Sequence, residues 1–136
     1  MPEDVAFQLS NPPTLATPAG YSHLATVGPG RLIFVSGQVA LDNKGHPVGK
    51  DDFQAQARQV FENLRAALEA AGASFRDVIK LNSYVVDIAG LAHFRAVRDE
   101  YVNTANPPAS TAVQVQRLFR PEFLLEVEAI AAVRVR

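Results

Sequence analysis

Hydrophobic and polar positions alternate along two stretches near the C-terminus, residues 109–116 and 124–133. A period of two is the pattern of a β-strand with two different faces. Glu126 and Glu128 fall on one face of the second stretch, opposite apolar side chains. Pro121 lies between the stretches, so a short turn and a terminal hairpin are expected. A carboxylate on such a strand is either solvated near an edge or, if buried, hydrogen-bonded or functional.

Apolar residues that recur every three or four positions predict two helices. The clearer one covers residues 51–72, where an aspartate precedes the apolar stripe and a glycine follows it. These residue types cap the first turn of a helix and end the last one. A second helix is expected over roughly residues 90–103, before a pair of prolines.

Three further strands are predicted earlier in the chain. Residues 21–27 and 31–38 flank Gly28-Pro29-Gly30, which is a turn signal, so a hairpin is expected there. Residues 78–87 have the composition of a buried strand. Residues 1–20 are rich in proline and are expected to form an irregular N-terminal arm with at most a short edge strand.

The predicted order is strand–strand–helix–strand–helix–strand–strand, in a single domain of 136 residues. Helices that connect strands by right-handed crossovers lie on the same side of the sheet, so we expect an α+β fold with two helices on one face of a five- or six-stranded sheet. Residues 31–38 and 78–87 carry apolar side chains on both faces, so the face without helices would expose a hydrophobic patch. A second copy of the chain is the simplest cover, which predicts a symmetric homo-oligomer.

Composition and charge disfavour several classes of partner and chemistry. The net charge is −1 without any run of Lys or Arg, so neither a nucleic acid nor a membrane surface is expected as the main partner. The lack of cysteine removes disulfides, thiolate catalysis and zinc–thiolate sites. No apolar run approaches the roughly 20 residues of a membrane helix, and Glu3 and Asp4 do not fit a signal peptide. A cytoplasmic location is expected.

Short catalytic motifs are absent from the sequence. It contains no G-x-S-x-G motif, no phosphate-binding loop and no dinucleotide-binding fingerprint. His23, His46 and His93 are widely separated and lack the paired spacing of metal ligands on one helix. Neither a metal site nor a cofactor is therefore expected.

Several short segments match, in order, the motifs of one protein family between about Tyr21 and Val133. They are LIFVSGQ (32–38), QARQ (56–59), NL (63–64), LEAAG (68–72), DVIK (77–80), VVD (85–87), PAS (108–110) and EVEAIA (126–131). Together they make the chain similar to the RidA/YjgF family, also called L-PSP endoribonuclease-like. The resemblance implies a chorismate-mutase-like α+β fold with a mixed sheet, assembled as a homotrimer with small-molecule sites in the clefts between subunits.

The resemblance also implies a chemistry, the hydrolysis of 2-imino or enamine acids to 2-keto acids and ammonia. In the family, a glutamate on the last strand positions or activates water, and an arginine on the preceding strand holds the substrate carboxylate. The glutamate corresponds to Glu128, whose structural alternative is a carboxylate bonded to a neighbouring strand or subunit. The arginine corresponds to Ser110, and a hydroxyl cannot replace a bidentate guanidinium. The chain thus resembles a branch that lacks this arginine, and weak or absent activity on 2-iminobutanoate is expected.

The remaining candidate site residues follow from the same resemblance. Ser36 would donate to the ligand, and Gly37 would let the backbone approach it. Ser110 and the backbone of Ala112 would line the same cleft, which their small side chains enlarge. The structural alternative for Ser36 is a buried hydroxyl that is satisfied within the sheet.

Tyr21, His23 and Arg95 complete the candidate set. Tyr21 and His23 precede the first predicted hairpin and would reach the cleft, where a histidine can transfer protons. Arg95 lies on the second predicted helix and would supply the positive charge that Ser110 lacks. The alternative for His23 and Arg95 is a solvated side chain.

Three other functions are compatible with the same resemblance or architecture. The first is a non-catalytic module that binds a metabolite in the same cleft. The second is a ribonuclease or translation inhibitor, which follows from the family label alone and is disfavoured by the charge balance. The third is a chorismate mutase, which needs several cationic groups around a dicarboxylate that the sequence does not reveal.

Overall fold

The structure, a computed structural model, describes residues 5–134. Its elements in chain order are β1 (Phe7–Ser10), β2 (Leu24–Val27), β3 (Arg31–Gln38), α1 (Phe53–Ala70), the 3₁₀ turn η1 (Phe75–Asp77), β4 (Val78–Val85), the 3₁₀ turn η2 (Ile88–Gly90), α2 (Leu91–Arg98), β5 (Ala109–Gln114) and β6 (Leu125–Val133). Four strands form one sheet in the order β3-β6-β4-β5, and β1 pairs with β2 in a separate sheet. The larger sheet is mixed, because β4 and β5 are parallel while its other pairs are antiparallel.

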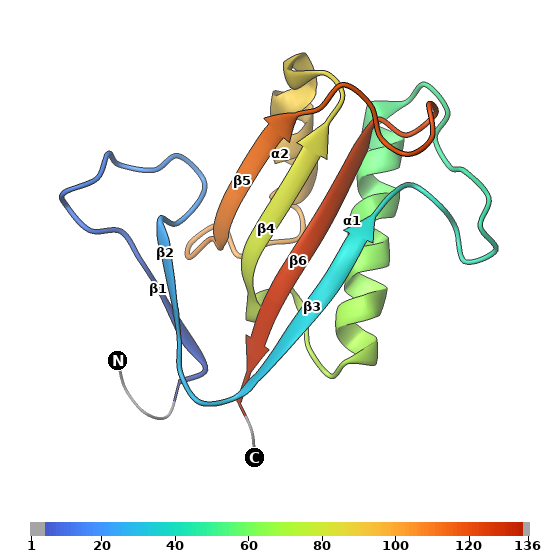
Figure 1. Ribbon diagram of the computed structural model, residues 1–136. Helices are drawn as coiled ribbons and strands as arrows, with labels where there is room; N and C mark the ends of the chain where they lie inside the picture. The colour runs from blue at the N-terminus through green and yellow to red at the C-terminus, as the bar shows by residue number, and fades with distance from the viewer. Residues whose placement is uncertain (1–4, 135–136) are drawn as a thin grey trace.

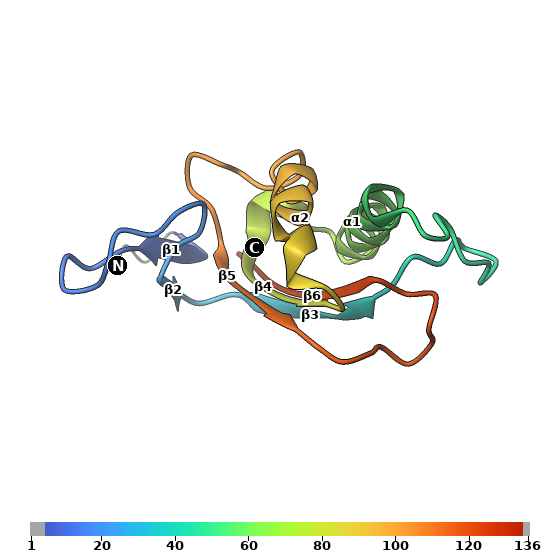
Figure 2. The same ribbon diagram turned by 90° about the horizontal axis from the view of Figure 1, so that it is seen from above.

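Both α-helices lie on one face of the four-stranded sheet, and the described residues place no helix on the other face, which we call the open face (Figures 1 and 2). The core fills the space between helices and sheet. Its largest fully buried side chains include Phe61 and Leu64 of α1, Phe94 of α2, and Leu81 and Leu125 of the sheet. The predicted α+β architecture with two helices on one face is confirmed.

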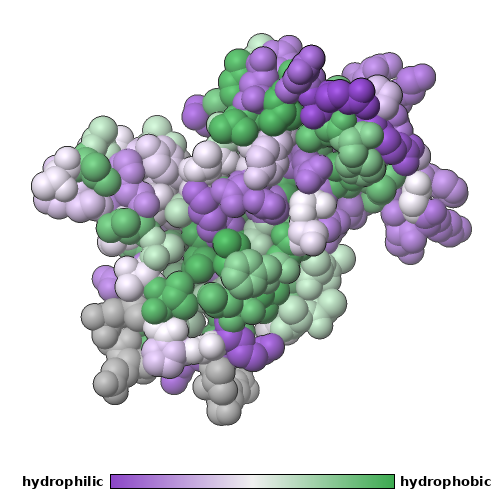
Figure 3. Space-filling model, viewed as in Figure 1, coloured by the Kyte–Doolittle hydropathy of each residue, from purple (hydrophilic) through white to green (hydrophobic). Residues whose placement is uncertain are grey.

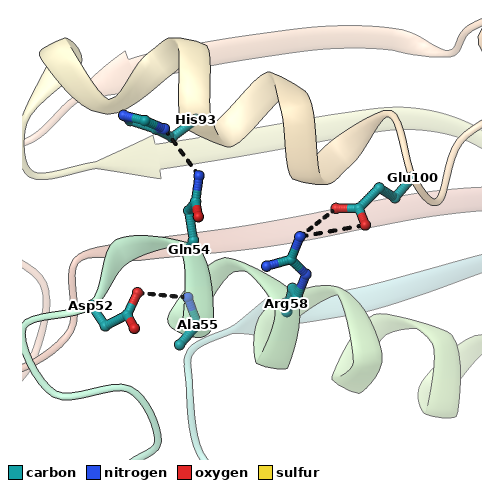
Figure 4. A network of polar contacts seen from close by, with 6 residues as sticks. All are labelled: Asp52, Gln54, Ala55, Arg58, His93 and Glu100. Atoms are coloured by element: carbon teal, nitrogen blue, oxygen red, sulfur yellow. Dashed lines mark hydrogen bonds and ion pairs between the residues drawn. The ribbon is translucent and has the colours of Figure 1, made fainter.

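Helix α1 begins where its sequence predicts. The Asp52 carboxylate accepts a hydrogen bond of 3.1 Å from the backbone of the first turn and so caps the helix. On the solvent side, Arg58 pairs with Glu100 at 3.1 Å, and Gln54 contacts the His93 ring at 3.1 Å (Figure 4). These contacts connect α1 to α2 and to the turn that follows α2.

Helix α2 is shorter than predicted, because it ends at Arg98 rather than near residue 103. The chain continues as a turn in which Tyr101 N donates to Arg98 O at 2.9 Å. This turn directs the Tyr101 ring onto Phe61, with the ring centres 5.2 Å apart. The Tyr101 ring therefore packs against the core from a turn and not from a continuous helix.

The predicted terminal hairpin is wrong, because β4 lies between β5 and β6. Val115 N donates to Val85 O at 2.8 Å, and Val86 N donates to Leu124 O at 3.1 Å. Both ends of the 115–124 connection are thus anchored to the end of β4, which the connection crosses. Strand β6 becomes a central strand, which suits its buried apolar face.

The hairpin predicted around Gly28-Pro29-Gly30 is also wrong. Strand β2 pairs with β1, inside the predicted N-terminal arm, whereas β3 pairs with β6 from Arg31 opposite Val133 onward. A Cβ atom at Gly30 would lie 2.3 Å from the Val133 carbonyl oxygen, so only glycine fits where the chain passes the end of β6. The chain turns here from the small sheet into the large one, which has four strands and not the five or six expected.

The open face of the sheet is only partly apolar. Strand β4 turns Lys80, Asn82 and Tyr84 toward this face, so the prediction that β4 is apolar on both faces is wrong. Strand β3 does expose hydrophobic side chains, with Leu32 49% and Phe34 71% accessible. Figure 3 shows hydrophobic and hydrophilic side chains next to one another on this side of the molecule. The homo-oligomer inferred from a hydrophobic patch on this face stays a prediction.

Candidate functional site

Glu128 lies in the middle of β6, and its carboxylate is fixed by the neighbouring strand β4. Asn82 Nδ2 donates to Glu128 Oε1 at 3.0 Å, and the Tyr84 hydroxyl donates to the same oxygen at 3.1 Å. Asn82 stands directly opposite Glu128 in the antiparallel pairing. No other hydrogen bond to this carboxylate comes from residues 5–134. One oxygen is therefore held in place while Oε2 keeps its capacity to accept from water or a ligand.

The alternation of residue types along β4 explains why these donors face Glu128. Successive side chains of a strand point to opposite faces, so Asn82 and Tyr84 share the open face while Leu81 and Val85 enter the core. Sequence reasoning missed both donors because it treated residues 78–87 as a buried strand. Polar residues at every second position were the signal that would have identified them.

Ser36 and Glu128 line the same hollow in the open face, with a volume of about 210 Å³. Phe34, Asn82 and Ile130 also contribute to its walls. The exposed position of Ser36 makes its hydroxyl accessible to a ligand in the hollow. The structure thus brings together two of the residues that the sequence assigned to the site, and the alternative of a buried Ser36 does not hold.

Gly37 makes room for a second carboxylate, that of Glu126. A Cβ atom at Gly37 would lie 2.0 Å from Glu126 Oε2 and 2.8 Å from its Cδ. Any side chain at this position therefore displaces the Glu126 carboxylate. Gly37 itself lines a different hollow of about 460 Å³, together with Phe119, and not the one beside Glu128.

Two groups around Glu128 have shifted pKa values. The hydrogen bond to Glu128, followed by burial, raises the pKa of Tyr84 above its usual value of 10.0. The Tyr84 phenol therefore stays protonated, and remains a donor, throughout the neutral range. Burial, followed by the charge of Glu128, raises the pKa of Glu126. The two carboxylates thus differ in their environment although they are two residues apart on one face.

Ser110 and Ala112 face the opposite side of the sheet from Glu128. In β5, Ser110 pairs in register with Leu81, which is fully buried on the helix side. Cross-strand partners share a face, so Ser110 and, two positions later, Ala112 point to the helix side. Arg95 belongs to the helix layer as well and is exposed on α2. Within one chain, none of these three residues is brought to Glu128.

Tyr21 and His23 lie beside the edge strand β5. Ser22, between them, donates its backbone N–H to Pro108 O at 3.1 Å, just before β5 begins. The rings of Tyr21 and His23 meet edge to face with centres 5.3 Å apart. His23 Nε2 also lies 2.6 Å from Ala16 O, which ties its ring to the N-terminal arm. Both residues are thus near the group on β5 and away from the hollow at Glu128.

The described residues were also searched for metal-binding clusters and for membrane-spanning helices. Within residues 5–134, no group of three or more His, Asp or Glu side chains is placed to hold a metal ion. None of the helices in the described part of the chain is long and apolar enough to cross a membrane.

A four-stranded mixed sheet with two helices on one face and a fixed carboxylate on the other places the protein among small α+β domains of the chorismate-mutase-like class. A crystal structure of a protein of unknown function from the Rid family of Yersinia pestis has the same fold, with a TM-score of 0.83 and 36% identity over 95% of this chain and 100% of that chain. The sequence model of the family described as Endoribonuclease L-PSP matches residues 12–133. The chain belongs to this family, the RidA/YjgF family, as its motifs predict.

Curated relatives agree with this assignment. A RutC family protein from Pyrococcus horikoshii is 43% identical over 102 residues, which cover 75% of this chain and 79% of the relative. A protein of Salmonella typhimurium named 2-iminobutanoate/2-iminopropanoate deaminase is 35% identical over 119 residues, which cover 81% of this chain and 91% of that protein.

Proposed function

We propose that this protein hydrolyses a reactive imine or enamine, with Glu128 as the residue that activates water. The fixed carboxylate is the observation that carries the proposal: Asn82 and Tyr84 hold Oε1, and the hollow of about 210 Å³ lies beside it. A carboxylate positioned in this way is suited to general base catalysis. The deaminase activity in the name of the Salmonella relative supports the assignment.

The proposed reaction consumes one water and releases one ammonia. Glu128 Oε2 accepts a proton from water as the water oxygen bonds to the imine carbon, and the electron pair of the C=N bond moves to the nitrogen. Glu128 then returns the proton to this nitrogen. The carbinolamine collapses to the carbonyl as the C–N bond breaks and ammonia leaves with the hydroxyl proton. Ser36 and nearby backbone groups bind the substrate during these steps.

The same proposal places the complete site between the subunits of a homotrimer. Leu32 and Phe34 are exposed next to the hollow, and a neighbouring copy that covers them would close it. Ser110 and Glu128 lie on opposite faces of one sheet, so a ligand that touches both needs residues from two copies. Closure by a neighbour would also exclude bulk water from the reacting atoms.

A non-catalytic role in metabolite binding is the second candidate. Ser110 favours it, because this residue occupies the position at which the family resemblance implies an arginine for the substrate carboxylate. A protein without that anchor can retain the hollow and lose turnover. The ribonuclease role has less support, since the net charge of −1 gives no concentrated basic surface for a nucleic acid.

The test uses imines generated in place from a panel of L-amino acids by an amino-acid oxidase, with semicarbazide as the competing trap. Wild-type protein should accelerate release of the keto acid from at least one imine, with 2-iminobutanoate among the poor substrates. Glu128→Gln should lower kcat by about 100-fold or more, the usual contribution of a general base. Glu69→Gln, an exposed glutamate on α1, is the matched control and should change nothing. Wild-type protein that binds keto acids but accelerates no imine hydrolysis would establish the binding role instead.

A further inference from the structure

A hollow of about 710 Å³ lies on the helix side of the molecule, beside the C-terminal half of α1. It is larger than the hollows beside Glu128 and Gly37, which have volumes of about 210 and 460 Å³. Three segments contribute to its walls, with Arg65 and Glu69 from α1, Phe75 and Arg76 from η1, and Tyr101 and Val102 from the turn after α2. None of these residues belongs to the Glu128 site, which lies on the opposite face of the sheet.

One side of this hollow is apolar. Phe75 and Val102 are buried, and the centre of the Phe75 ring lies 5.5 Å from that of the Tyr101 ring. Burial, followed by a hydrogen bond with Glu62, raises the pKa of Tyr101 to about 12, so the phenol is uncharged at neutral pH. An aliphatic or aromatic group of a ligand can therefore pack on this side and leave water.

The other walls of the hollow carry charges, and two of these are not neutralised within the described residues. Arg65 pairs with Glu62 at 3.2 Å, and its guanidinium carbon lies 4.9 Å from the centre of the Tyr101 ring. None of the ion pairs formed by residues 5–134 includes Arg76 or Glu69. A cation and an anion thus line one hollow without pairing with each other, and both keep their capacity to bind a charged group that arrives from outside.

This charge pattern favours a zwitterion over a simple ion. An anion is attracted by Arg76 but repelled by Glu69, and an amine without a carboxylate has the reverse problem. An α-amino acid offers a carboxylate to the guanidinium and an ammonium to the glutamate, with charge-assisted hydrogen bonds to both.

We propose that this hollow binds an α-amino acid with an apolar side chain, which packs on Phe75 and Tyr101. The volume of about 710 Å³ accommodates such a molecule, since small-molecule pockets usually have about 300–1,000 Å³. The amino acid is bound here and not converted. The inference thus goes beyond the proposed function and does not depend on it, because the sheet separates this hollow from Glu128.

The test compares four ligands of the wild-type protein in calorimetric titrations. L-Phenylalanine has all the proposed groups, whereas 3-phenylpropanoate lacks the ammonium, phenethylamine lacks the carboxylate and glycine lacks the apolar side chain. L-Phenylalanine should bind most tightly, and each of the others should bind about fivefold or more weakly, because each lacks one contact. In nuclear magnetic resonance titrations, L-phenylalanine should shift the amide signals of residues 69–76 and 101–103 more than those of residues 126–130.

Two substitutions test the charged contacts. Arg76→Gln should weaken binding of L-phenylalanine about fivefold or more and leave binding of phenethylamine unchanged, since that ligand has no carboxylate. Glu69→Gln should weaken binding of L-phenylalanine by a similar factor and should not weaken binding of 3-phenylpropanoate, which has no ammonium. Both side chains are exposed, so the fold should tolerate either change. Arg58→Gln is the matched control, because Arg58 of α1 pairs with Glu100 and does not line the hollow (Figure 4).

Equal binding of all four ligands, or no saturable binding of L-phenylalanine by wild-type protein, would overturn the inference. Signal shifts confined to residues 126–130 would also overturn it, because they would place the amino acid in the hollow beside Glu128. Wild-type affinity for L-phenylalanine in both Arg76→Gln and Glu69→Gln would reject the assigned contacts. Imine hydrolysis is measured separately through Glu128, so a failure of the hydrolase proposal and a failure of this inference are distinguishable.

Discussion

At the scale of single residues, the hydrogen bond between Tyr84 and Glu128 links the protonation of the phenol to the charge of the carboxylate. The bond to Glu128 is the largest cause of the raised pKa of Tyr84, followed by burial. A raised pKa means that folding favours the protonated phenol. The resulting stability is present below the usual tyrosine pKa and is lost as the pH rises through the higher pKa of the folded state. The hydrogen bond from the Tyr84 hydroxyl to Glu128 should thus persist across the neutral pH range.

Replacement of Glu128 by Gln should therefore lower the pKa of Tyr84 toward its usual value, because the carboxylate that stabilises the protonated phenol is removed. The measurement is a titration of tyrosinate absorbance, with Tyr84→Phe to identify the signal among the three tyrosines. Glu126→Gln serves as the control and should have a smaller effect, since the charge of Glu126 is the last contributor to the shift. If both substitutions lowered the pKa of Tyr84 by the same amount, the assigned hydrogen bond from Tyr84 to Glu128 would be contradicted.

Substitutions at Gly37 and at Glu126 should have coupled effects on the free energy of unfolding. Gly37→Ala places a methyl group where the Glu126 carboxylate lies, so we expect a loss of about 1–3 kcal/mol, the usual cost of overpacking. The double variant with Glu126→Ala removes the clash and should lose less than the two single variants together. Denaturant unfolding of the four proteins measures this coupling. Additive losses would contradict the assigned clash between a side chain at position 37 and the Glu126 carboxylate.

At the scale of elements, Gln56 connects α1 to the segment that leads into β6. Its side chain is almost completely buried; Nε2 donates to Gly49 O at 3.1 Å and to Glu122 O at 2.9 Å, and Oε1 accepts from Leu124 N at 2.9 Å. One amide thus satisfies three backbone groups, one in the segment before α1 and two in the segment before β6. Because β6 carries Glu128, this contact helps to fix the strand on which the site is built.

Substitution of Gln56 by Ala should destabilise the fold by about 2–4 kcal/mol, since it leaves buried backbone groups without partners. Gln54→Ala removes an exposed glutamine of the same helix and should cost no more than about 0.5 kcal/mol. Chemical denaturation followed by circular dichroism measures both. A loss for Gln56→Ala as small as that of the control would show that water replaces the missing contacts.

The elements themselves were largely predictable from the sequence, whereas their partners were not. The apolar stripe of α1, its Asp52 cap and the alternation along β6 are local patterns, and the structure follows them. Strand pairing depends on contacts between distant segments, so adjacency in sequence suggested two hairpins that do not form. The close passage of Gly30 against Val133 is such a distant contact, and the sequence around Gly30 has no sign of it.

The candidate site was also predicted only in part from the sequence. Glu128 and Ser36 were identified through family motifs, and the structure places them at one hollow. Asn82 and Tyr84 were missed although their alternation with Leu81 was visible in the sequence, because β4 was interpreted as apolar on both faces. That Ser110 faces away from Glu128 follows from the register of β5 on β4, which no local pattern fixes.

At the scale of the whole molecule, the open face has two parts with different chemical character. Polar side chains from β4 and β6 surround Glu128, and Leu32 and Phe34 of β3 remain exposed beside them. Exposed apolar side chains beside a polar hollow are suited to a contact with another copy of the chain, as we propose. Under the proposed assembly, a neighbouring copy that covers Phe34 would also close the hollow, so assembly and function would be connected.

Phe34→Asp should convert the assembly into single copies, because it places a charge in the centre of the proposed contact, where it would be desolvated without a partner. Sedimentation velocity at micromolar concentration should show wild-type protein as an oligomer and the variant as a monomer that keeps its far-ultraviolet dichroism. Ile88→Asp, which alters an exposed apolar residue of η2 at 45% accessibility, is the matched control and should remain assembled. The monomeric variant should also lose affinity for keto acids, although Glu128 and Asn82 are intact. A wild-type protein that sediments as one copy, or a monomeric variant with full affinity, would mean that one chain forms the complete site.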